Sequence, residues 1–314
     1  MKPEDGYISY IINPKSGASS SNFVGKKFLD YLLRNKFDVR TRYTGSIEDA
    51  YEFAVEASAD HQCALVSACG GDGTIREVAR GLQKGQKSLL IIPGGTENLL
   101  ANELGYDEKV KTIINAFESG LEKPLDLGTA NERCFTSITG FGFDAQVVKS
   151  LDEDRKGHID YLDYVWPIWR AFWKYKFCPI KVEIDGEAVF HGPGLVFVGN
   201  ISRYAMGLGI LRNADYGDGL LDVCIYKCPG RIRFVKHSLM TLAKYHTKCP
   251  DVIYRRGKNI RVDSGNGVVF CQIDGDPGPD LPVEINVVPS AVKVLVPENA
   301  KPAGIRTRFI RAIG

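Results

Sequence analysis

The chain has 314 residues, of which 44% are hydrophobic and 25% are charged, as is typical of a folded globular protein. Its 40 basic and 38 acidic residues give a net charge of +2, so attraction to nucleic acid through whole-protein charge is not expected. A chain of this length predicts two domains.

The cysteines and the N-terminal stretch indicate in which cellular compartment the protein is expected. The eight cysteines include no C-x-x-C pair, so we expect reduced thiols and neither a zinc site nor a disulfide framework. The N-terminal stretch turns polar too early for a signal peptide, and no run of about 18 uncharged apolar residues occurs. We therefore expect a cytoplasmic protein without a transmembrane helix, with peripheral association at a membrane left open.

The first part of the chain alternates short apolar runs with helical patterns. Strands are expected at Tyr7–Ile12, Asp38–Tyr43, Cys63–Ala68 and Ser88–Ile92. Helices are expected at Phe23–Leu33, Ile47–Ala59, Ile75–Leu82, Asn98–Leu104 and Val110–Phe117. This alternation predicts a parallel sheet covered by helices on both faces. Residues 1–126 are therefore predicted to form an α/β domain.

Beyond residue 126 the pattern changes to short strands separated by turn residues. The strands are expected at Phe135–Ile138, Ile180–Ile184, Gly194–Gly199, Leu221–Tyr226, Asn259–Val262, Val268–Ile273, Val283–Val288 and Val292–Val296. The spacing predicts an antiparallel sandwich or barrel over residues 127–297, with helical patches near 158–177 and 231–246. Residues 298–314 form a basic tail that either packs on the first domain or frays.

Three glycine-containing loops follow strands of the predicted parallel sheet. They are Asn13–Gly17 (NPKSG), Gly70–Thr74 (GGDGT) and Pro93–Asn98 (PGGTEN). Strand ends rich in glycine before a helix expose backbone N–H groups, which attract phosphate. The loops should converge at the carboxyl edge of the sheet, each with a Ser or Thr hydroxyl available. One such loop is most simply a plain turn, but three together predict a nucleotide site, although no Walker or Rossmann motif is present.

Three further motifs follow in order: LDLG at residues 125–128, DGLLD at 218–222 and QIDGD at 272–276. The ordered set extends across nearly the whole chain and resembles the diacylglycerol kinase catalytic family, which includes sphingosine and ceramide kinases and bacterial soluble lipid kinases. GGDGT alone is shared with NAD kinases. The resemblance implies an NAD-kinase-like α/β nucleotide-binding domain and a C-terminal antiparallel β-sandwich domain, with ATP in the cleft.

The resemblance also assigns nucleotide contacts. The expected residues are Asn13, Lys15, Ser16, Gly17, Thr44, Gly70, Gly71, Asp72, Gly73, Thr74, Gly95 and Thr96. Because like charges repel, Asp72 cannot bind phosphate directly, so we expect it to act through Mg²⁺ or on the acceptor hydroxyl. The alternative is that Asp72 merely caps the following helix.

The QIDGD element holds the candidate general base. In the family its last residue is usually Glu and is the proposed base that takes the proton from the lipid hydroxyl. Here that position is Asp276, which is one methylene shorter, so Asp274 shares or takes the role as an alternative. Without the resemblance, this segment would be interpreted as a surface turn.

An acidic turn at Asp215–Asp222 precedes a predicted strand. Closely spaced oxygen ligands suit a hard cation such as Mg²⁺. The resemblance implies a structural Mg²⁺ held by Asp215, Asp218 and the carbonyl of Leu220. The alternative is a solvated acidic hairpin turn.

All three tryptophans lie in the segment 158–177. Trp166, Trp169, Trp173 and Phe177 recur at helical spacing on one face, and basic residues interrupt the apolar pattern. The simplest interpretation is that these aromatic side chains cover the sandwich. Contact with lipid headgroups and a role in lining an acyl-chain pocket are alternatives.

The resemblance therefore implies an ATP- and Mg²⁺-dependent lipid kinase that phosphorylates the hydroxyl of diacylglycerol or of a sphingoid-like lipid. Glycine loops, a cation and acidic residues supply the positioning and charge neutralisation that phosphoryl transfer needs. An NAD kinase and a catalytically silent nucleotide- or lipid-binding regulator stay open as alternatives. The sequence names neither the acceptor lipid nor the oligomeric state, for which a homodimer is one option.

Overall fold

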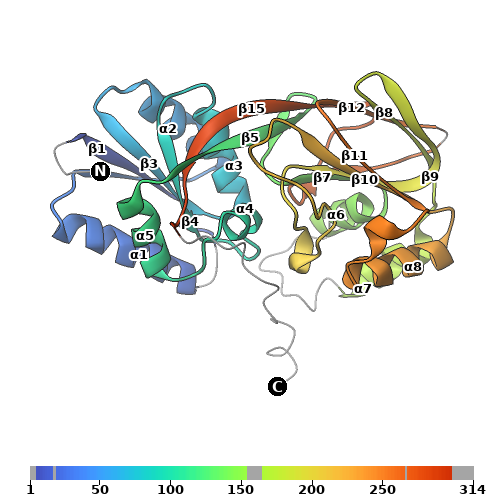
Figure 1. Cartoon of the computed structure of the whole chain (residues 1–314). Coiled ribbons are helices and arrows are strands. Elements are labelled where there is room, and N and C mark those ends of the chain that lie inside the picture. Colours follow the sequence, from blue (N-terminus) through green and yellow to red (C-terminus); the bar gives the residue numbers. More distant parts are fainter. Residues whose placement is uncertain (1–4, 17–18, 154–164, 266, 299–314) are drawn as a thin grey trace. The chain divides into compact units, whose positions relative to one another are not determined.

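The computed structural model describes residues 5–16, 19–153, 165–265 and 267–298, which form two compact units (Figure 1). One unit holds the described residues up to Asp126, Ala205–Gly207 and the segment from Ser290 onward. The other holds the described residues from Leu127 to Pro289, apart from that short insertion. The sequence expectation had kept residues 290–297 with the second domain. The expected nucleotide contact Gly17 and residues 299–314 of the expected tail lie outside the described residues.

The first unit contains a parallel sheet in the strand order β2-β1-β3-β4. Its strands are β1 (Tyr7–Ile12), β2 (Val39–Tyr43), β3 (Cys63–Gly70) and β4 (Ser88–Pro93). β1, β3 and β4 are almost wholly buried, as continuous apolar strands are when helices cover both faces of a sheet. The predicted α/β fold is confirmed.

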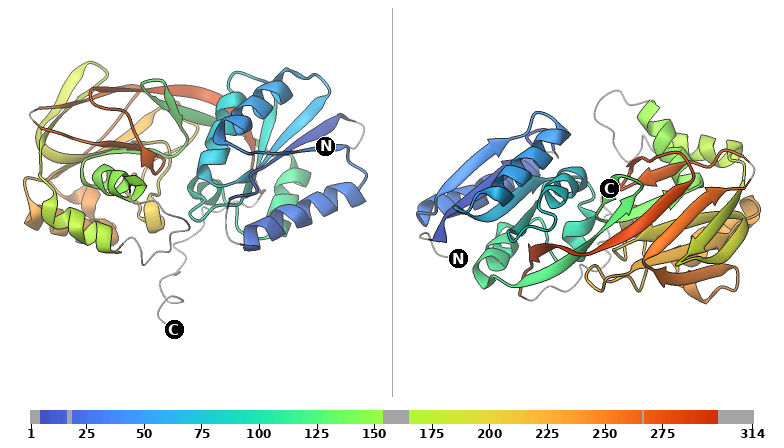
Figure 2. Two further views of the ribbon diagram at one scale, coloured as in Figure 1. Left: turned by 180° about the vertical axis from the view of Figure 1, so that it is seen from behind. Right: turned by 90° about the horizontal axis from the view of Figure 1, so that it is seen from above.

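Helices cover the two faces of this sheet (Figures 1 and 2). On one face the helices are α1 (Ser19–Arg34) and α5 (Val110–Ser119), and on the other they are α2 (Ile47–Ala59) and α3 (Asp72–Gly81). A short helix, α4 (Leu99–Glu103), follows β4. Because α3 starts at Asp72 and not at Ile75, the GGDGT motif forms both the end of β3 and the first turn of the helix.

Two strands contribute to both units. β5 (Glu122–Ala130) leaves the first unit after Asp126, and β15 (Val283–Leu295) re-enters it at Ser290. Asp126 is fully buried, and its Oδ1 accepts a hydrogen bond of 2.6 Å from the backbone nitrogen of Ser290. The LDLG motif therefore fixes the point at which the chain passes between the units.

β15 is one strand where two were expected. The expectation divided it because Pro289 lies in the middle of the apolar pattern. Its register with β12 (Asn259–Ser264) uses residues 283–286, and its parallel register with β4 uses residues 293–294. Pro289, which has no N–H to donate, falls between these two pairings and interrupts neither.

The second unit is a sandwich of two antiparallel sheets, as predicted. One sheet is built from β8 (Pro179–Ile184), β12, β15, β5 and β6 (Arg133–Phe135). The other has β14 (Asp276–Pro277), β13 (Cys271–Ile273), β7 (Ile138–Phe141), β9 (Glu187–Gly199), β10 (Leu221–Lys227) and β11 (Val252–Gly257). β9 joins both sheets, because it pairs with β8 over its first half and with β7 and β10 over its second.

Alternation along β9 builds a core on each face of the second sheet. Val196 and Val198 belong to the core inside the sandwich, whereas Leu195 and Phe197 belong to a core on the opposite face. The helices over that opposite face are α6 (Phe143–Glu153), α7 (Val165–Lys174) and α8 (Arg231–Leu242) (Figure 2). Helix α6 and strand β11 were not expected from the sequence.

The tryptophan segment is divided between the core and the surface. Tyr175 is buried in the helical core and Phe172 packs against that core, so part of the segment covers the sheet. Trp169 and Trp173 are each 54% exposed, which covering the sheet does not explain. Phe177 was expected on the same face, but it lies past the end of α7 and is partly buried against the helical core. The side chain of Trp166 is outside the described part.

None of the helices in the described part of the chain combines the length and the apolar run that spanning a bilayer requires. All eight cysteines are free thiols, and seven of them are buried. Their burial is that expected of small apolar residues.

Candidate functional site

The carboxyl ends of β1 to β4 carry the glycine loops and Thr44. We call these four loops the loop rim: residues 13–16, 44–46, 70–74 and 93–98. Parallel strands bring their carboxyl ends to one edge of a sheet, and the order β2-β1-β3-β4 makes the loops neighbours. The predicted convergence of the loops is therefore confirmed.

Asn13 joins the first loop to the GGDGT loop. Its backbone nitrogen donates to the carbonyl of Cys69 at 2.9 Å, and its Nδ2 donates to Thr74 Oγ1 at 3.0 Å. Its Oδ1 in turn accepts a hydrogen bond of 3.0 Å from the backbone nitrogen of Lys15. The asparagine is thus held at three points between β1 and β3.

Two other side chains of the first loop reach the remaining loops. Ser16 Oγ donates to the carbonyl of Gly94 at 2.9 Å, and Lys15 Nζ donates to the carbonyl of Gly45 at 3.2 Å. The backbone of Thr44 donates to Ile12 at 2.9 Å. The four loops therefore form one hydrogen-bonded rim along the sheet edge.

The three hydroxyls that were expected to be available to phosphate differ in their surroundings. Thr74 is only 3% exposed and its Oγ1 accepts from Asn13, while the Ser16 hydroxyl donates its proton to Gly94. Thr96 is exposed at the surface of its loop. In this structure Ser16 and Thr74 hold the rim together, and Thr96 faces solvent.

Most glycines of the rim are explained by contact between the loops. A Cβ added to Gly95 would lie 2.7 Å from the Cα of Gly71, and one added to Gly94 would lie 3.0 Å from the Cα of Gly70. The backbone nitrogen of Gly94 also donates to the carbonyl of Gly70 at 2.8 Å. The β3 and β4 loops therefore pack backbone against backbone, which side chains at these positions would prevent.

Gly73 has no such explanation. Among the described residues, the only atom within 4 Å of a Cβ added there is Ile47 Cδ1 at 3.8 Å, which is an ordinary contact. Its φ is not in the left-handed region that favours glycine. Glycine in a helix costs about 1 kcal/mol relative to alanine. The open backbone at the start of α3 is instead suited to close approach by an anion.

Asp72 is the first residue of α3, and Gly71 is the N-cap, without a side-chain capping bond. Asp72 Oδ1 accepts a hydrogen bond of 3.4 Å from the backbone nitrogen of Leu100 and so links α3 to α4. Asp72 therefore lies within the first turn of α3, one residue past the N-cap position. Its position in the first turn remains favourable, because a negative charge there opposes the positive end of the helix dipole.

Asn98, which was not among the candidate site residues, fixes the shape of the PGGTEN loop. It has a left-handed φ of 50° at the N-cap of α4. Its Oδ1 accepts from the nitrogen of Gly95 at 2.7 Å and its Nδ2 donates to the carbonyl of Gly95 at 2.8 Å. Asparagine tolerates this conformation better than most residues, so its place between a loop and a helix was a usable signal.

The QIDGD element of the second unit is a tight hairpin between β13 and β14. Asp274 and Gly275 have φ angles of 49° and 86°, and they connect the paired residues Ile273 and Asp276. Two positive φ angles define a type I′ turn, for which Asp-Gly is a preferred pair. Gln272 is fully buried, and its Oε1 accepts from the nitrogen of Gly275 at 2.9 Å.

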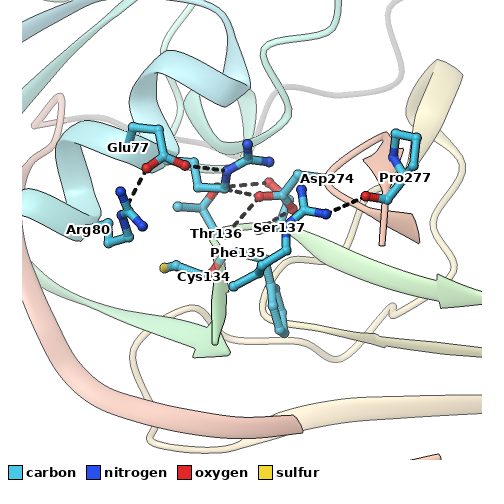
Figure 3. Close-up of polar contacts among 10 residues, drawn as sticks. Glu77, Arg80, Cys134, Phe135, Thr136, Ser137, Asp274 and Pro277 are labelled. Atoms are coloured by element: carbon cyan, nitrogen blue, oxygen red, sulfur yellow. Dashed lines mark hydrogen bonds and ion pairs between the residues drawn. The ribbon is translucent and has the colours of Figure 1, made fainter. Parts of the chain in front are cut away.

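The carboxylate of Asp274 is surrounded by backbone donors (Figure 3). Its Oδ2 accepts from the nitrogen of Thr136, and its Oδ1 accepts from the nitrogens of Ser137 and Ile138, each at 3.0 Å. This carboxylate therefore ties the hairpin to the start of β7. Asp276 lies at the other end of the turn, in β14.

The acidic turn before β10 closes on itself through its aspartates. Asp215 Oδ1 accepts from the nitrogen of Gly217, and Asp218 Oδ1 accepts from the nitrogen of Leu220, both at 3.1 Å. These are turns in which a side chain takes the place of a backbone acceptor. The expected metal ligands are thus neighbours, as predicted, within a self-bonded turn.

Arg256 in β11 supplies positive charge to this turn. It forms an ion pair with Asp218, and its Nε lies 3.5 Å from Asp222 Oδ2. Asp222 is 1% exposed and accepts from Tyr254 Oη at 2.7 Å, and burial raises its pKa to about 6. Within the described ranges, no three His, Cys, Asp or Glu side chains gather as a metal site. Arg256 therefore opposes binding of the implied Mg²⁺ at Asp218, and a metal held by Asp215, Asp218 and the carbonyl of Leu220 stays a prediction.

Another carboxyl group lies at the start of α6. Asp144 Oδ2 accepts from Tyr204 Oη at 3.3 Å, while its buried Oδ1 has no hydrogen-bond partner in the part of the protein that is described. Gly140 leaves the space for it, since a Cβ there would lie 2.1 Å from Asp144 Oδ2. Burial raises the pKa of Asp144 to about 6. Sequence reasoning missed this group, which follows the GFGF stretch.

Comparisons with known proteins agree with the two units. Residues 8–130 match the diacylglycerol kinase catalytic domain, and residues 137–296 match the YegS C-terminal NAD kinase beta sandwich-like domain. A crystal structure of a diacylglycerol kinase from Bacillus anthracis has a TM-score of 0.73 and 22% identity, covering 93% of this chain and 98% of that one. It shares the fold.

Curated relatives match along nearly their whole length. A Mycobacterium tuberculosis diacylglycerol kinase is 28% identical over 303 residues, covering 94% of this chain and 97% of its own. A Streptococcus pneumoniae protein described as a "putative lipid kinase" is 31% identical over 296 residues, covering 90% and 96%. The resemblance drawn from the ordered motifs is confirmed. The chain belongs to the diacylglycerol kinase family, and with it to an enzyme class of lipid kinases.

Proposed function

We propose that the protein transfers the γ-phosphoryl group of ATP, with Mg²⁺, to the hydroxyl of a lipid, and that diacylglycerol is the first acceptor to test. The observation that carries the nucleotide half of the proposal is the open backbone at Gly73, at the start of a helix and within the loop rim. The names of the relatives that match over nearly the whole chain support the lipid as acceptor.

The phosphate-binding role is assigned to the first turn of α3 and to Lys15. The first N–H groups of a helix have no partner within it, and together with the helix dipole they attract an anion. Lys15 is exposed on the neighbouring loop and adds a positive charge. Mg²⁺, when bound, would neutralise phosphate charge, and Asp72, in the first turn of α3, is the carboxylate proposed to hold it.

Asp276 is proposed as the general base, and Asp274 as a residue that positions it. Asp274 already accepts three backbone hydrogen bonds, so its oxygens are engaged in fixing the hairpin. In the transfer, Asp276 takes the proton of the acceptor hydroxyl while the hydroxyl oxygen bonds to the γ-phosphorus. The bond from that phosphorus to the bridging oxygen breaks, and ADP leaves with its electrons.

The acidic turn has no catalytic part in this proposal. Arg256 pairs with Asp218 and lies beside Asp222, so the chain itself offsets the charge of these two carboxylates. The turn leads into β10, whose first residue, Leu221, pairs with Gly257, the last residue of β11.

The test is a transfer assay with radiolabelled ATP and purified protein. The acceptors are diacylglycerol, a sphingoid base and ceramide in mixed micelles, with NAD as a further acceptor. We expect label on a lipid, and a loss of at least about 100-fold in Asp276→Asn, the usual effect of removing a general base. Asp280→Asn, which changes an exposed aspartate just after β14, is the matched control and should keep full activity.

Each alternative has its own outcome in this assay. Label on NAD and on no lipid identifies an NAD kinase, and ATP binding without transfer to any acceptor identifies a silent regulator. Either result contradicts the proposal. If Asp276→Asn stays active while Asp274→Asn folds normally but is inactive, the roles of the two aspartates are reversed.

A further inference from the structure

The amide of Gln272 in the QIDGD element is buried but uses only its oxygen. Gln272 is fully buried in β13, and its Oε1 accepts from the backbone nitrogen of Gly275 at 2.9 Å. Its Nε2 carries two N–H donors and has no hydrogen-bond partner in the described part of the chain. Because a buried donor without an acceptor is costly, the nitrogen of this glutamine requires an explanation.

The carboxyl group of Asp144 lies next to this amide. Gly140 of β7 pairs with Gln272, and a Cβ added to Gly140 would lie 2.8 Å from Gln272 Nε2 and 2.1 Å from Asp144 Oδ2. Helix α6, which carries Asp144, lies beside β7 and also packs against β13 and β14 (Figure 1). The donor and the carboxylate are therefore neighbours over a glycine that leaves space for both.

The hydrogen bonding of Asp144 is also incomplete. Its Oδ2 accepts from Tyr204 Oη at 3.3 Å, whereas its buried Oδ1 has no partner among the residues that the structure describes. Burial raises the pKa of Asp144 to about 6, and the Gln272 amide is among the groups that lower it, because a donor stabilises the charged carboxylate. A buried acceptor that lacks a donor thus lies beside a buried donor that lacks an acceptor.

The orientation of the Gln272 amide matters for the hairpin. With Nε2 directed toward Asp144, the opposite atom, Oε1, accepts the hydrogen bond from the nitrogen of Gly275. If the amide turned over, Nε2 would meet the N–H group of Gly275, and two donors would oppose each other. An acceptor beside Nε2 therefore selects the orientation that closes the DGD turn.

We propose that Asp144 is a positioning residue for Asp276, the proposed general base. Its carboxylate accepts a hydrogen bond from Gln272 Nε2 and so keeps Oε1 on the nitrogen of Gly275. The turn fixed in this way leads directly into Asp276. The inference deepens the proposed function and rests on it, because Asp276 acts as a base only if a hydroxyl is phosphorylated. Displacing a reacting group by about 1 Å lowers a rate by roughly 100-fold, so small shifts of the hairpin matter.

The first test measures kcat and KM with the acceptor found in the transfer assay, at about pH 8, where Asp144 is ionised. Asp144→Ala should lower kcat at least ~10-fold and leave the KM for ATP within ~2-fold, because the loop rim belongs to the other unit. Asp144→Asn keeps an acceptor oxygen and should stay within ~3-fold of the wild type. Gln146→Ala, which changes another partly buried polar residue of α6, is the matched control and should keep the wild-type kcat.

A reversed pair tests the contact itself. Gln272→Glu keeps an acceptor for Gly275 but sets a second carboxylate against Asp144, and it should lower kcat at least ~10-fold. Asp144→Asn combined with Gln272→Glu exchanges donor and acceptor and should restore kcat to within ~3-fold of the wild type. This comparison also decides the question if Asp144→Ala does not fold. A double variant no more active than Gln272→Glu overturns the contact, and a wild-type kcat in Asp144→Ala overturns the positioning role.

Hydrogen exchange separates positioning from chemistry. The backbone amide of Gly275 should exchange at least ~10-fold faster in Asp144→Ala than in the wild type and in Gln146→Ala, because its acceptor is no longer held. Faster exchange in a protein that transfers phosphate to no acceptor would support the role of Asp144 in holding the hairpin and defeat the kinase proposal alone. Unchanged exchange overturns the positioning role, whatever the activity.

Discussion

The loop rim of the first unit and the polar groups of the second unit are built in opposite ways. The rim joins its loops mainly through backbone groups and short side chains, and glycines stand where the loops touch. In the second unit the polar groups are carboxylates on a turn, a strand and a helix, namely Asp274, Asp222 and Asp144. The first region depends on the absence of side chains, and the second on the presence of charge. Different substitutions should therefore disturb the two regions.

The largest expected effect is in the second unit, at Asp274. Replacing it with alanine leaves the nitrogens of Thr136, Ser137 and Ile138 without their acceptor. Leaving several buried donors unpaired should lower the free energy of unfolding by about 3 kcal/mol or more. All three tryptophans lie within α7, so denaturant unfolding followed by tryptophan fluorescence reports on this unit.

Asp280→Ala is the control for this substitution, because Asp280 is an exposed aspartate just beyond the hairpin. It should change the free energy of unfolding by less than about 0.5 kcal/mol. Equal and small effects at the two positions would contradict the view that the second unit depends on the carboxylate of Asp274.

In the rim, two glycines should respond with opposite signs. Gly95→Ala brings a Cβ within 2.7 Å of the Cα of Gly71 and should cost about 1–3 kcal/mol of stability through overpacking. Gly73→Ala has space and should stabilise the fold by up to ~1 kcal/mol, while weakening ATP binding at least tenfold. Unfolding followed by circular dichroism and titration calorimetry with ATP measure the two effects. A Gly73→Ala protein that binds ATP normally would contradict its assigned role.

A smaller effect should appear in the pH dependence of stability. The pKa of Asp144 is about 6 in the folded protein, above the value near 3.9 of an unfolded chain, so the folded state holds this proton more tightly. Its contribution is complete below about pH 4 and is lost as the pH rises through about 6. Asp144→Asn should remove a fall of about 1–2 kcal/mol over that range, after allowance for partial exposure.

Asp222 shares the raised pKa, so some dependence on pH should persist in Asp144→Asn. Fluorescence-monitored unfolding at several pH values between 4 and 7 is the measurement. A variant whose stability follows the wild-type curve at every pH would show that the carboxyl of Asp144 is not held neutral.

The loops of the rim could be predicted from the sequence because their signals are local. A strand that ends at Gly70 and a turn such as NPKSG can be recognised from a few neighbouring residues. The hydrogen bond of the Ser16 hydroxyl could not be predicted, because its partner Gly94 is 78 residues away and becomes a neighbour only when the sheet forms. The local sequence therefore predicted where the site lies. Which hydroxyl groups remain free to bind phosphate depends on tertiary packing.

In the second unit the signals were less local. Asp274 holds backbone groups about 136 to 138 residues earlier, and no sequence pattern near the DGD turn predicts that. Helix α6 did leave a local sign, since Phe143, Val147 and Leu151 recur every four residues, but the two glycines just before it favoured a turn. The exposed apolar stripe of α8 could not be predicted from the sequence, because the same residue spacing suits a buried stripe and an exposed one.

The pairing of β15 with β4 sets the order in which the protein can mature on the ribosome. Residues 291–296 are almost entirely buried in the first unit, yet they are synthesised after the whole second unit. Until they emerge, the nascent first unit has an open sheet edge at β4, which is a template for wrong pairing. A fragment ending at Asp126 should therefore aggregate, and a soluble first unit should require residues 290–298 to be joined back to it through a linker.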